Sequence, residues 1–224
     1  LLVLPAPIRG LDRHLAETRT WLEHMLPSTS GKAIANQPGR AFKSGNQSLL
    51  SVVHRYTRDI EAAGPDSAPK GIRVNVTSIT PEASFMVYAA IAGVIGVVYL
   101  IVMPVERWRT RRTNAMEYSI LLLLMVLFSP KAGTYFYCWA LPAFTVITAE
   151  LLRAPPGSRR SWGLLSGLTL SLMLTASAVT QALNVYTPQA LGVTMWGSLI
   201  LVFILLAMLG SEKFVLRTEG AVLA

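Results

Sequence analysis

Charged residues are scarce in this sequence, and so are the residue types that bind metals or form disulfides. Asp, Glu, Lys and Arg make up 14 % of the 224 residues, whereas soluble domains contain roughly 25 %. The 52 % share of hydrophobic residues excludes a disordered chain, because such chains are poor in apolar residues. The single cysteine, Cys138, excludes an intramolecular disulfide and a cysteine-based metal cluster. The composition therefore indicates a membrane protein.

Metal ions and nucleic acids are not expected as partners. His14 and His24 are ten residues apart, and His54 has no neighbouring ligand in the sequence. The net charge of +8 would suit nucleic acid, but the basic residues lie at the ends of hydrophobic bands, where positive charge orients membrane helices. We therefore expect no metal, no cofactor and no nucleic acid, and membrane lipids as neighbours.

Long apolar bands occupy the C-terminal part of the chain. They cover residues 83–105, 118–149, 161–183 and 188–210. Each is at least as long as the roughly 20 residues that a membrane-spanning helix needs. The 118–149 band is long enough for two spans and is interrupted at Ser129-Pro130-Lys131.

The arginines around this band decide the number of crossings. One cluster lies at 107–112 and the other at 153–160, on either side of the 118–149 band. Because short cytoplasmic loops hold Lys and Arg, two crossings place both clusters inside, whereas one crossing would separate them. We predict an all-α integral membrane protein, a polytopic bundle of about five transmembrane helices with an outer-face segment that carries short helices.

Four regions are expected along the chain. They are the end of a truncated transmembrane helix at 1–9, an extracytoplasmic segment at 10–82, the five-span bundle at 83–210 and a cytoplasmic tail at 211–224. The truncated helix is expected because the chain opens in an apolar stretch without Met or a charged region. Helical apolar periodicity over 11–26 predicts either an interfacial helix or a helix packed on an extramembrane core.

Lys131 is a candidate functional residue because of its expected depth. A helix from Met116 to Ser129 covers only about 20 Å, which is shorter than the ~30 Å hydrocarbon core. We therefore expect the break to lie below the outer membrane surface, against protein or a watery cavity. A lysine there is either functional or extends to the headgroups.

A row of small residues predicts a close helix contact. Gly163, Gly167 and Ser171 recur every four residues along one face of the 161–183 span. Small side chains at that spacing let the backbone of a second helix approach closely.

Two short motifs resemble a known enzyme family. Gly45-Asn46-Gln47-Ser48-Leu49, with Arg55 downstream, resembles the extracytoplasmic "NQSL…R" loop of the family-87 glycosyltransferases. Phe128-Ser129-Pro130-Lys131 through Ala140-Leu141-Pro142-Ala143 resembles that family's "SP…LLPAL" stretch. The order of loop, span, Arg-rich turn and span ending in Ser-Pro also fits. The resemblance covers essentially the whole chain as the C-terminal half of such an enzyme.

The resemblance implies a membrane hexosyltransferase of the GT-C class, a mannosyltransferase type that uses a polyprenyl-phosphate donor. The acceptor would be a glycolipid, polysaccharide or protein on the outer face of the bacterial cytoplasmic membrane. Lys131 and Arg55 would stabilise the donor phosphate, and Asn46 and Gln47 would supply amide contacts. Without the resemblance, Asn-Gln-Ser is typical of a helix-capping turn, with Ser48 capping a short helix.

Two departures from the family bear on this hypothesis. The family's catalytic acidic residue lies in a first outer loop that this sequence lacks, so no catalytic residue is assigned within the sequence. Many members also carry a histidine shortly after Ser-Pro, where this sequence reads Lys131 to Tyr137. The alternative is a non-enzymatic transporter or membrane scaffold subunit, with Lys131 lining a solute path; paired broken helices in related halves would indicate it, and the sequence shows one break and no repeat.

Overall fold

The computed structural model describes residues 42–62, 71–105, 109–176 and 187–222, together with Ala16 and Arg19. Residues 1–38 and 39–224 form two compact units, and the helices from residue 49 onward belong to the second. The truncated helix expected at 1–9 lies outside the described residues. The interfacial helix expected at 11–26 also lies outside them, apart from those two single residues.

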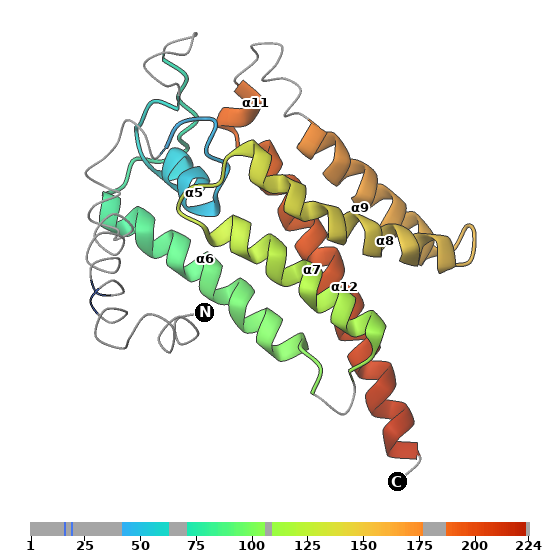
Figure 1. Ribbon diagram of the computed structural model, residues 1–224. Helices are drawn as coiled ribbons and strands as arrows, with labels where there is room; N and C mark the ends of the chain where they lie inside the picture. Colours follow the sequence, from blue (N-terminus) through green and yellow to red (C-terminus); the bar gives the residue numbers. More distant parts are fainter. Residues whose placement is uncertain are drawn as a thin grey trace. The chain divides into compact units, whose positions relative to one another are not determined.

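Helices make up the regular structure of the described ranges (Figure 1). In chain order they are α5 (Leu49–Thr57), α6 (Pro81–Val102), α7 (Arg111–Phe128), the 3-10 helix η2 (Thr134–Ala140), α8 (Leu141–Arg153), α9 (Arg159–Ala176), α11 (Thr187–Ala190) and α12 (Val193–Val222). Within these ranges the only β pairing is an isolated bridge between Asn46 and Gly133. The all-α prediction is therefore confirmed for the described part of the chain.

Three helical segments among the described residues are long and apolar enough to cross a membrane. They are Pro81–Val102, Tyr135–Arg153 and Val193–Phe214. This finding is compatible with a multi-pass membrane protein. Helices α7 and α9 occupy the places of the other two expected spans, but both begin with polar turns that contain arginines. Five spans therefore remain a prediction.

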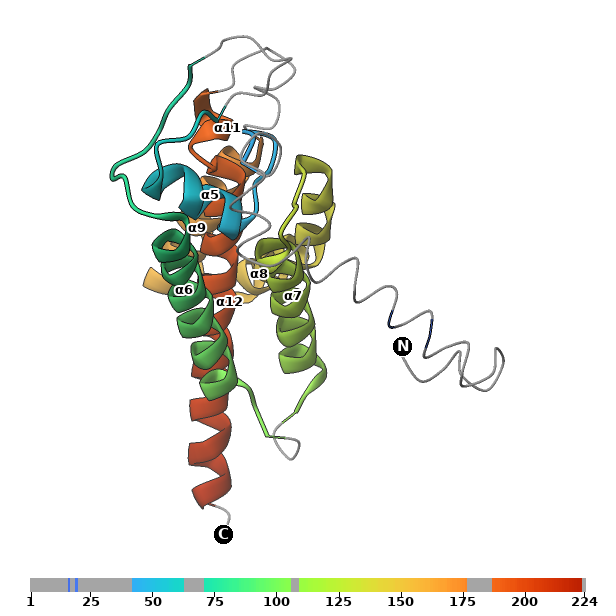
Figure 2. The same cartoon turned by 90° about the vertical axis from the view of Figure 1, so that its left-hand side faces the viewer.

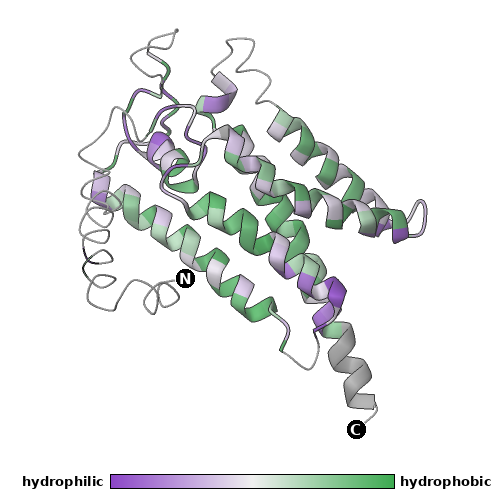
Figure 3. Ribbon diagram, in the orientation of Figure 1, coloured by the Kyte–Doolittle hydropathy of each residue, from purple (hydrophilic) through white to green (hydrophobic). Residues whose placement is uncertain are grey.

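Helix α12 forms the centre of the bundle and packs against α6, α7, α8 and α9. Its residues Leu201, Val202, Leu205 and Leu209 are fully buried. Helix α6 differs, because only Ser84 and Ile95 along its length are buried. An apolar helix with an exposed surface is typical of one that faces lipid. Figure 3 shows this apolar character along α6, with polar residues gathered at the first turn of α7.

Helices α9 and α12 approach closely at small residues. Ser171 Oγ donates a hydrogen bond to the Gly197 carbonyl at 2.8 Å. A Cβ added at Gly167 would lie 2.5 Å from Ile204 Cδ1, whereas one at Gly163 would meet nothing within 4 Å. The predicted close contact is thus confirmed at Gly167 and Ser171, and Gly163 lies outside it.

Helix α7 begins earlier than the length argument assumed. Thr110 and Thr113 form a reciprocal capping box, so the helix begins at Arg111 and runs for 18 residues. At 1.5 Å per residue its length is about 27 Å, close to the ~30 Å hydrocarbon core. The start at Met116 was therefore wrong, and the helix length no longer requires the Ser-Pro-Lys break to lie deep in the membrane.

Both arginine clusters meet at Glu150, which is 2 % exposed. Arg112 Nε donates to Glu150 Oε1 at 2.7 Å, Arg153 to Oε1 at 3.1 Å and Arg160 to Oε2 at 3.2 Å. Arg112 also pairs with Glu212 of α12 at 2.9 Å. This Glu150 cluster (Glu150, Arg112, Arg153, Arg160 and Glu212) joins α7, α8, α9 and α12. The two clusters therefore lie at the same end of the bundle, as two crossings between them require.

The glycine at the α9–α12 contact gives a first prediction. Gly197→Leu should lower the free energy of unfolding by about 1–3 kcal/mol, the usual cost of overpacking a tight contact. A Cβ there would already lie 3.0 Å from the Ser171 carbonyl oxygen and from Thr175 Cγ2. Thermal unfolding of the purified protein in detergent measures the loss. The matched control, Gly163→Leu, should unfold at the wild-type temperature, and equal losses in both variants would contradict the contact.

Candidate functional site

The candidate site is built where three segments far apart in the sequence meet, at the end of the bundle away from the Glu150 cluster. These segments are residues 42–58, 129–140 and 187–192. Hydrogen bonds join the first to each of the other two. Helices α5 and α11 lie at this end in both Figure 1 and Figure 2. The site therefore depends on tertiary contacts rather than on any single helix.

Asn46 joins the Asn-Gln-Ser loop (residues 44–48) to the Ser-Pro-Lys turn (residues 129–133). Its Nδ2 donates to the Pro130 carbonyl at 3.0 Å, and its Oδ1 accepts from the Ala132 amide at 3.0 Å. The Gln47 amide donates to the Ala132 carbonyl at 2.7 Å. The turn that follows α7 is thus held by both ends of one carboxamide. Two motifs 84 residues apart are in direct contact.

Ser48 caps helix α5. Its Oγ accepts a hydrogen bond from the Ser51 amide at 3.2 Å, which satisfies one of the unpaired N–H groups at a helix start. The predicted short helix after Ser48 is confirmed. The capping interpretation therefore holds for Ser48, while its neighbours Asn46 and Gln47 make tertiary contacts that a local capping turn would not need.

Gln47 is fully buried inside the site. Its Nε2 donates to the Gln189 carbonyl at 2.8 Å, and Tyr137 Oη donates to the Gln47 carbonyl at 2.6 Å. These two bonds tie the loop to α11 and to η2. The Gln47 side chain, which was predicted to contact the donor, thus points into the protein, where Gln47 helps to hold the three segments together.

Arg55 is also fully buried, and its guanidinium lies among backbone carbonyls. Nε and Nη1 donate to the carbonyls of Ala190 at 2.9 Å, Lys43 at 2.9 Å and Asn46 at 2.8 Å, and Nη1 also donates to Ser51 Oγ at 3.0 Å. Among the described residues no carboxylate pairs with it. Burial lowers the pKa of Arg55 to about 10, so the side chain is charged at pH 7. The structure therefore places this predicted phosphate ligand inside the protein, where its hydrogen bonds position the 42–46 loop and α11.

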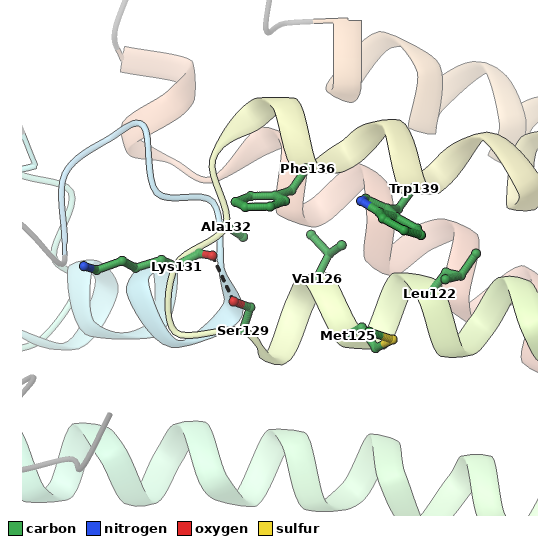
Figure 4. A pocket seen from close by; sticks show the side chains of 8 residues that line it. All are labelled: Leu122, Met125, Val126, Ser129, Lys131, Ala132, Phe136 and Trp139. Atoms are coloured by element: carbon green, nitrogen blue, oxygen red, sulfur yellow. Dashed lines mark hydrogen bonds between the residues drawn. The ribbon is translucent and has the colours of Figure 1, made fainter. Parts of the chain in front are cut away.

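Of the four predicted site residues, two are cations, and Lys131 is the exposed one. It borders a cavity of about 210 Å³ whose other lining residues are Leu122, Met125, Val126, Ser129, Ala132, Phe136 and Trp139. Ser129 Oγ donates to the Lys131 carbonyl at 2.9 Å, which fixes the backbone of the turn. Figure 4 shows the Lys131 side chain pointing away from Phe136 and Trp139. Its ammonium group is thus free to meet a ligand or lipid headgroup outside the cavity.

An apolar groove lies beside the loop, and the sequence did not reveal it. Its volume is about 550 Å³, and α5, α6 and α12 line it. The lining side chains are almost all apolar, among them Val52, Ile91, Val94, Leu199 and Phe203. Each belongs to a predicted helix, but the groove forms only where α5, α6 and α12 come together.

His54 is a buried neighbour of Arg55 that the sequence marked only as a poor metal ligand. It is 1 % exposed, and its ring stacks on Phe42 with ring centroids 4.7 Å apart. Burial, and then the charge of Arg58, lower the pKa of His54 to about 4. No group of His, Cys, Asp and Glu among the described residues is arranged to hold a metal ion.

The class defined by this geometry is an all-α bundle with three helices able to cross a membrane and a hydrogen-bonded polar site at one end. No protein-family model, curated protein or solved structure matches the chain. The likeness to the family-87 glycosyltransferases therefore rests on the short motifs quoted for it and on their order.

Arg55 should be required for folding rather than for binding alone. Arg55→Lys should lower the free energy of unfolding by about 2–4 kcal/mol, because one ammonium cannot replace the planar fork and leaves buried carbonyls unpaired. Thermal unfolding in detergent measures the change. The control is Arg73→Lys, whose side chain is 58 % exposed in an ion pair with Asp59 and should contribute little. Wild-type stability of Arg55→Lys would exclude the positioning role.

His54 should make stability depend on pH. Its folded pKa of about 4 lies below the ordinary 6.5, so the unfolded chain binds more protons between these values. The stability that the neutral His54 contributes is fully present above pH 6.5 and is lost as the pH falls to about 4. The shift corresponds to about 3–4 kcal/mol at most, at roughly 1.4 kcal/mol per pKa unit. Unfolding temperatures of wild type and His54→Asn at pH 4.5 and 7.5 test it, and equal pH dependence in both would refute it.

Proposed function

We propose that this protein is a membrane glycosyltransferase that moves a hexose from a polyprenyl-phosphate donor to an acceptor on the outer face of the bacterial cytoplasmic membrane. Mannose is the proposed hexose. The observation that carries the proposal is the contact between the Asn-Gln-Ser loop and the Ser-Pro-Lys turn. These are the two motifs in which the sequence resembles the family-87 enzymes. Their direct hydrogen bonding supports a single functional unit rather than two chance matches.

The transfer chemistry assigns different roles to the four predicted residues. Displacement at the anomeric carbon leaves a phosphate anion, which preorganised cations and N–H donors stabilise. Lys131 is exposed within the turn and is proposed to contact that phosphate. Asn46, Gln47 and Arg55 are proposed to hold the turn through the bonds described above. The acceptor hydroxyl would lose its proton to a carboxylate, and none of the described residues is assigned that role.

The apolar groove along α5, α6 and α12 supports a lipid-linked donor. A polyprenyl chain needs an apolar surface that continues from the site into the hydrocarbon region. The groove begins at α5 residues such as Leu49 and Val52, which follow the Asn-Gln-Ser loop directly, and extends along α6 to Val98. The phosphate would then remain at the polar end and the chain would follow the two long helices.

The proposed topology has five spans, with the site outside and the Glu150 cluster in the cytoplasm. The convergence of both arginine clusters on Glu150 supports it, because short cytoplasmic loops hold Lys and Arg. Helix α7 then crosses outward to the Ser-Pro-Lys turn, and η2 with α8 returns. The outer placement of Lys131 matches an extracytoplasmic donor.

Lys131 gives the test of this function. In the full protein, Lys131→Met should lower sugar transfer from a polyprenyl-phosphate donor by about 10²–10³-fold, the usual effect of removing one preorganised electrostatic contact. Lys131→Arg should recover only part of the rate, because a guanidinium keeps the charge without the compact ammonium. The measurement is the initial rate of transfer of labelled mannose in proteoliposomes.

A matched control separates a specific contact from a general loss of charge. Lys43 lies in the loop that leads to Asn46, and Lys43→Met removes the same charge. It should keep a rate within about threefold of wild type. If Lys131→Met is as active as Lys43→Met, Lys131 only reaches the lipid headgroups, and the donor contact is refuted. If the wild-type protein transfers no sugar, the proposed function itself fails.

A further inference from the structure

A second cavity lies at the opposite end of the bundle, between the start of α7 and the end of α8. Its volume is about 340 Å³. Arg111, Arg112, Glu150 and Arg153 form its charged part, and Ala115, Thr145, Val146 and Ala149 line the remainder. The charged residues belong to the first turn of α7 and the last turn of α8, and the other lining residues lie nearer the middle of each helix. The cavity is therefore amphipathic along its length.

The charged part has an excess of positive charge. Arg112, Arg153 and Arg160 all pair with the single carboxylate of Glu150, and Arg112 also pairs with Glu212. Three guanidiniums thus face two carboxylates. Arg111 adds a further positive charge, since no carboxylate among the described residues pairs with it. An anion at this cavity would be attracted by uncompensated charge.

Two of the arginines have N–H groups available for such an anion. Arg153 uses one Nη atom for Glu150 and is 67 % exposed, while a guanidinium carries five N–H donors. Arg111 is exposed as well. Arg112, by contrast, donates to Glu150 through two nitrogens and to Glu212 through the third. Arg111 and Arg153 are therefore the side chains that would bind the anion.

The position of Arg153 indicates what kind of anion this is. Arg153 ends the segment Tyr135–Arg153, one of the three segments able to cross a membrane. The end of such a segment lies at the level of the lipid headgroups. Lys213 of α12 is at the same end of the bundle, where its Nζ donates to the Ile101 carbonyl at 2.6 Å. Phosphate at this level belongs chiefly to phospholipids, and basic pockets between membrane helices bind anionic headgroups.

We propose that this cavity binds an anionic phospholipid, with its phosphate at Arg111 and Arg153 and part of an acyl chain against Ala115, Val146 and Ala149. Glu150 holds Arg153 in place through its 3.1 Å ion pair. A bound lipid would join α7 to α8 beside the Glu150 cluster. The inference is independent of the proposed sugar transfer, because it uses neither Lys131 nor the Asn-Gln-Ser loop.

Native mass spectrometry of the full protein in a neutral detergent tests the proposal. Phosphatidylglycerol and phosphatidylcholine with the same acyl chains are the two probes. Two arginines near an anionic lipid predict a preference of about 30-fold for phosphatidylglycerol. The variant Arg111→Gln/Arg153→Gln should reduce that preference to about threefold or less. An equal preference in wild type and variant would overturn the site.

The control variant removes the same charge elsewhere. Arg73 and Arg159 are exposed and do not line the cavity, so Arg73→Gln/Arg159→Gln should keep the wild-type preference. Loss of the preference in this control would show that net charge alone attracts the lipid and would overturn the proposal. Inorganic phosphate at millimolar concentration should not displace phosphatidylglycerol. Displacement by phosphate would show a free-anion site and would likewise overturn lipid binding.

Discussion

The buried guanidinium of Arg55 is the interaction on which the polar end of the bundle depends. A charged group removed from water must be solvated by the protein, and here backbone carbonyls from the 42–46 loop and from α11 perform that function. Because the fork is planar and rigid, these carbonyls can occupy only a narrow range of positions. The loop position in turn places Asn46, which holds the turn after α7. The turn that carries Lys131 is therefore linked to the buried Arg55 through the loop and Asn46.

The opposite end of the bundle is organised by the reverse arrangement, a buried carboxylate among arginines. Glu150 draws together α7, α8 and α9, and Glu212 adds α12 through Arg112. Charges are thus concentrated at the two ends, and the helices between them are apolar (Figure 3). This distribution is compatible with a multi-pass membrane protein, because an ion is costly in hydrocarbon and much less costly among the headgroups. Between the two ends, close contacts such as that of Ser171 with Gly197 join neighbouring helices.

Apolar surface and polar site are adjacent at the proposed donor end. Helix α5 contributes to both. It follows the hydrogen-bonded loop directly, and its residues Leu49, Val52 and Val53 line the groove. A lipid-linked substrate has the same division into a charged head and an apolar chain. The arrangement therefore supports the proposed donor class more directly than it supports any particular sugar or acceptor.

The sequence alone determined the helical class, the positions of the apolar bands and the short capped helix at Ser48, because these depend on hydropathy and on local hydrogen bonding. It also indicated that Gly167 and Ser171 allow a close helix contact. The start of α7 at Arg111 follows from the local Thr110–Thr113 capping box, a signal that the length argument overlooked. Only the tertiary structure decided that Arg112 pairs with Glu150 and Glu212, because those carboxylates belong to other helices. The sequence also predicted that both Arg55 and Lys131 contact the donor phosphate. Burial separated them, because carbonyls from distant segments enclose Arg55 and leave Lys131 exposed, and no local pattern in the sequence records such long-range contacts.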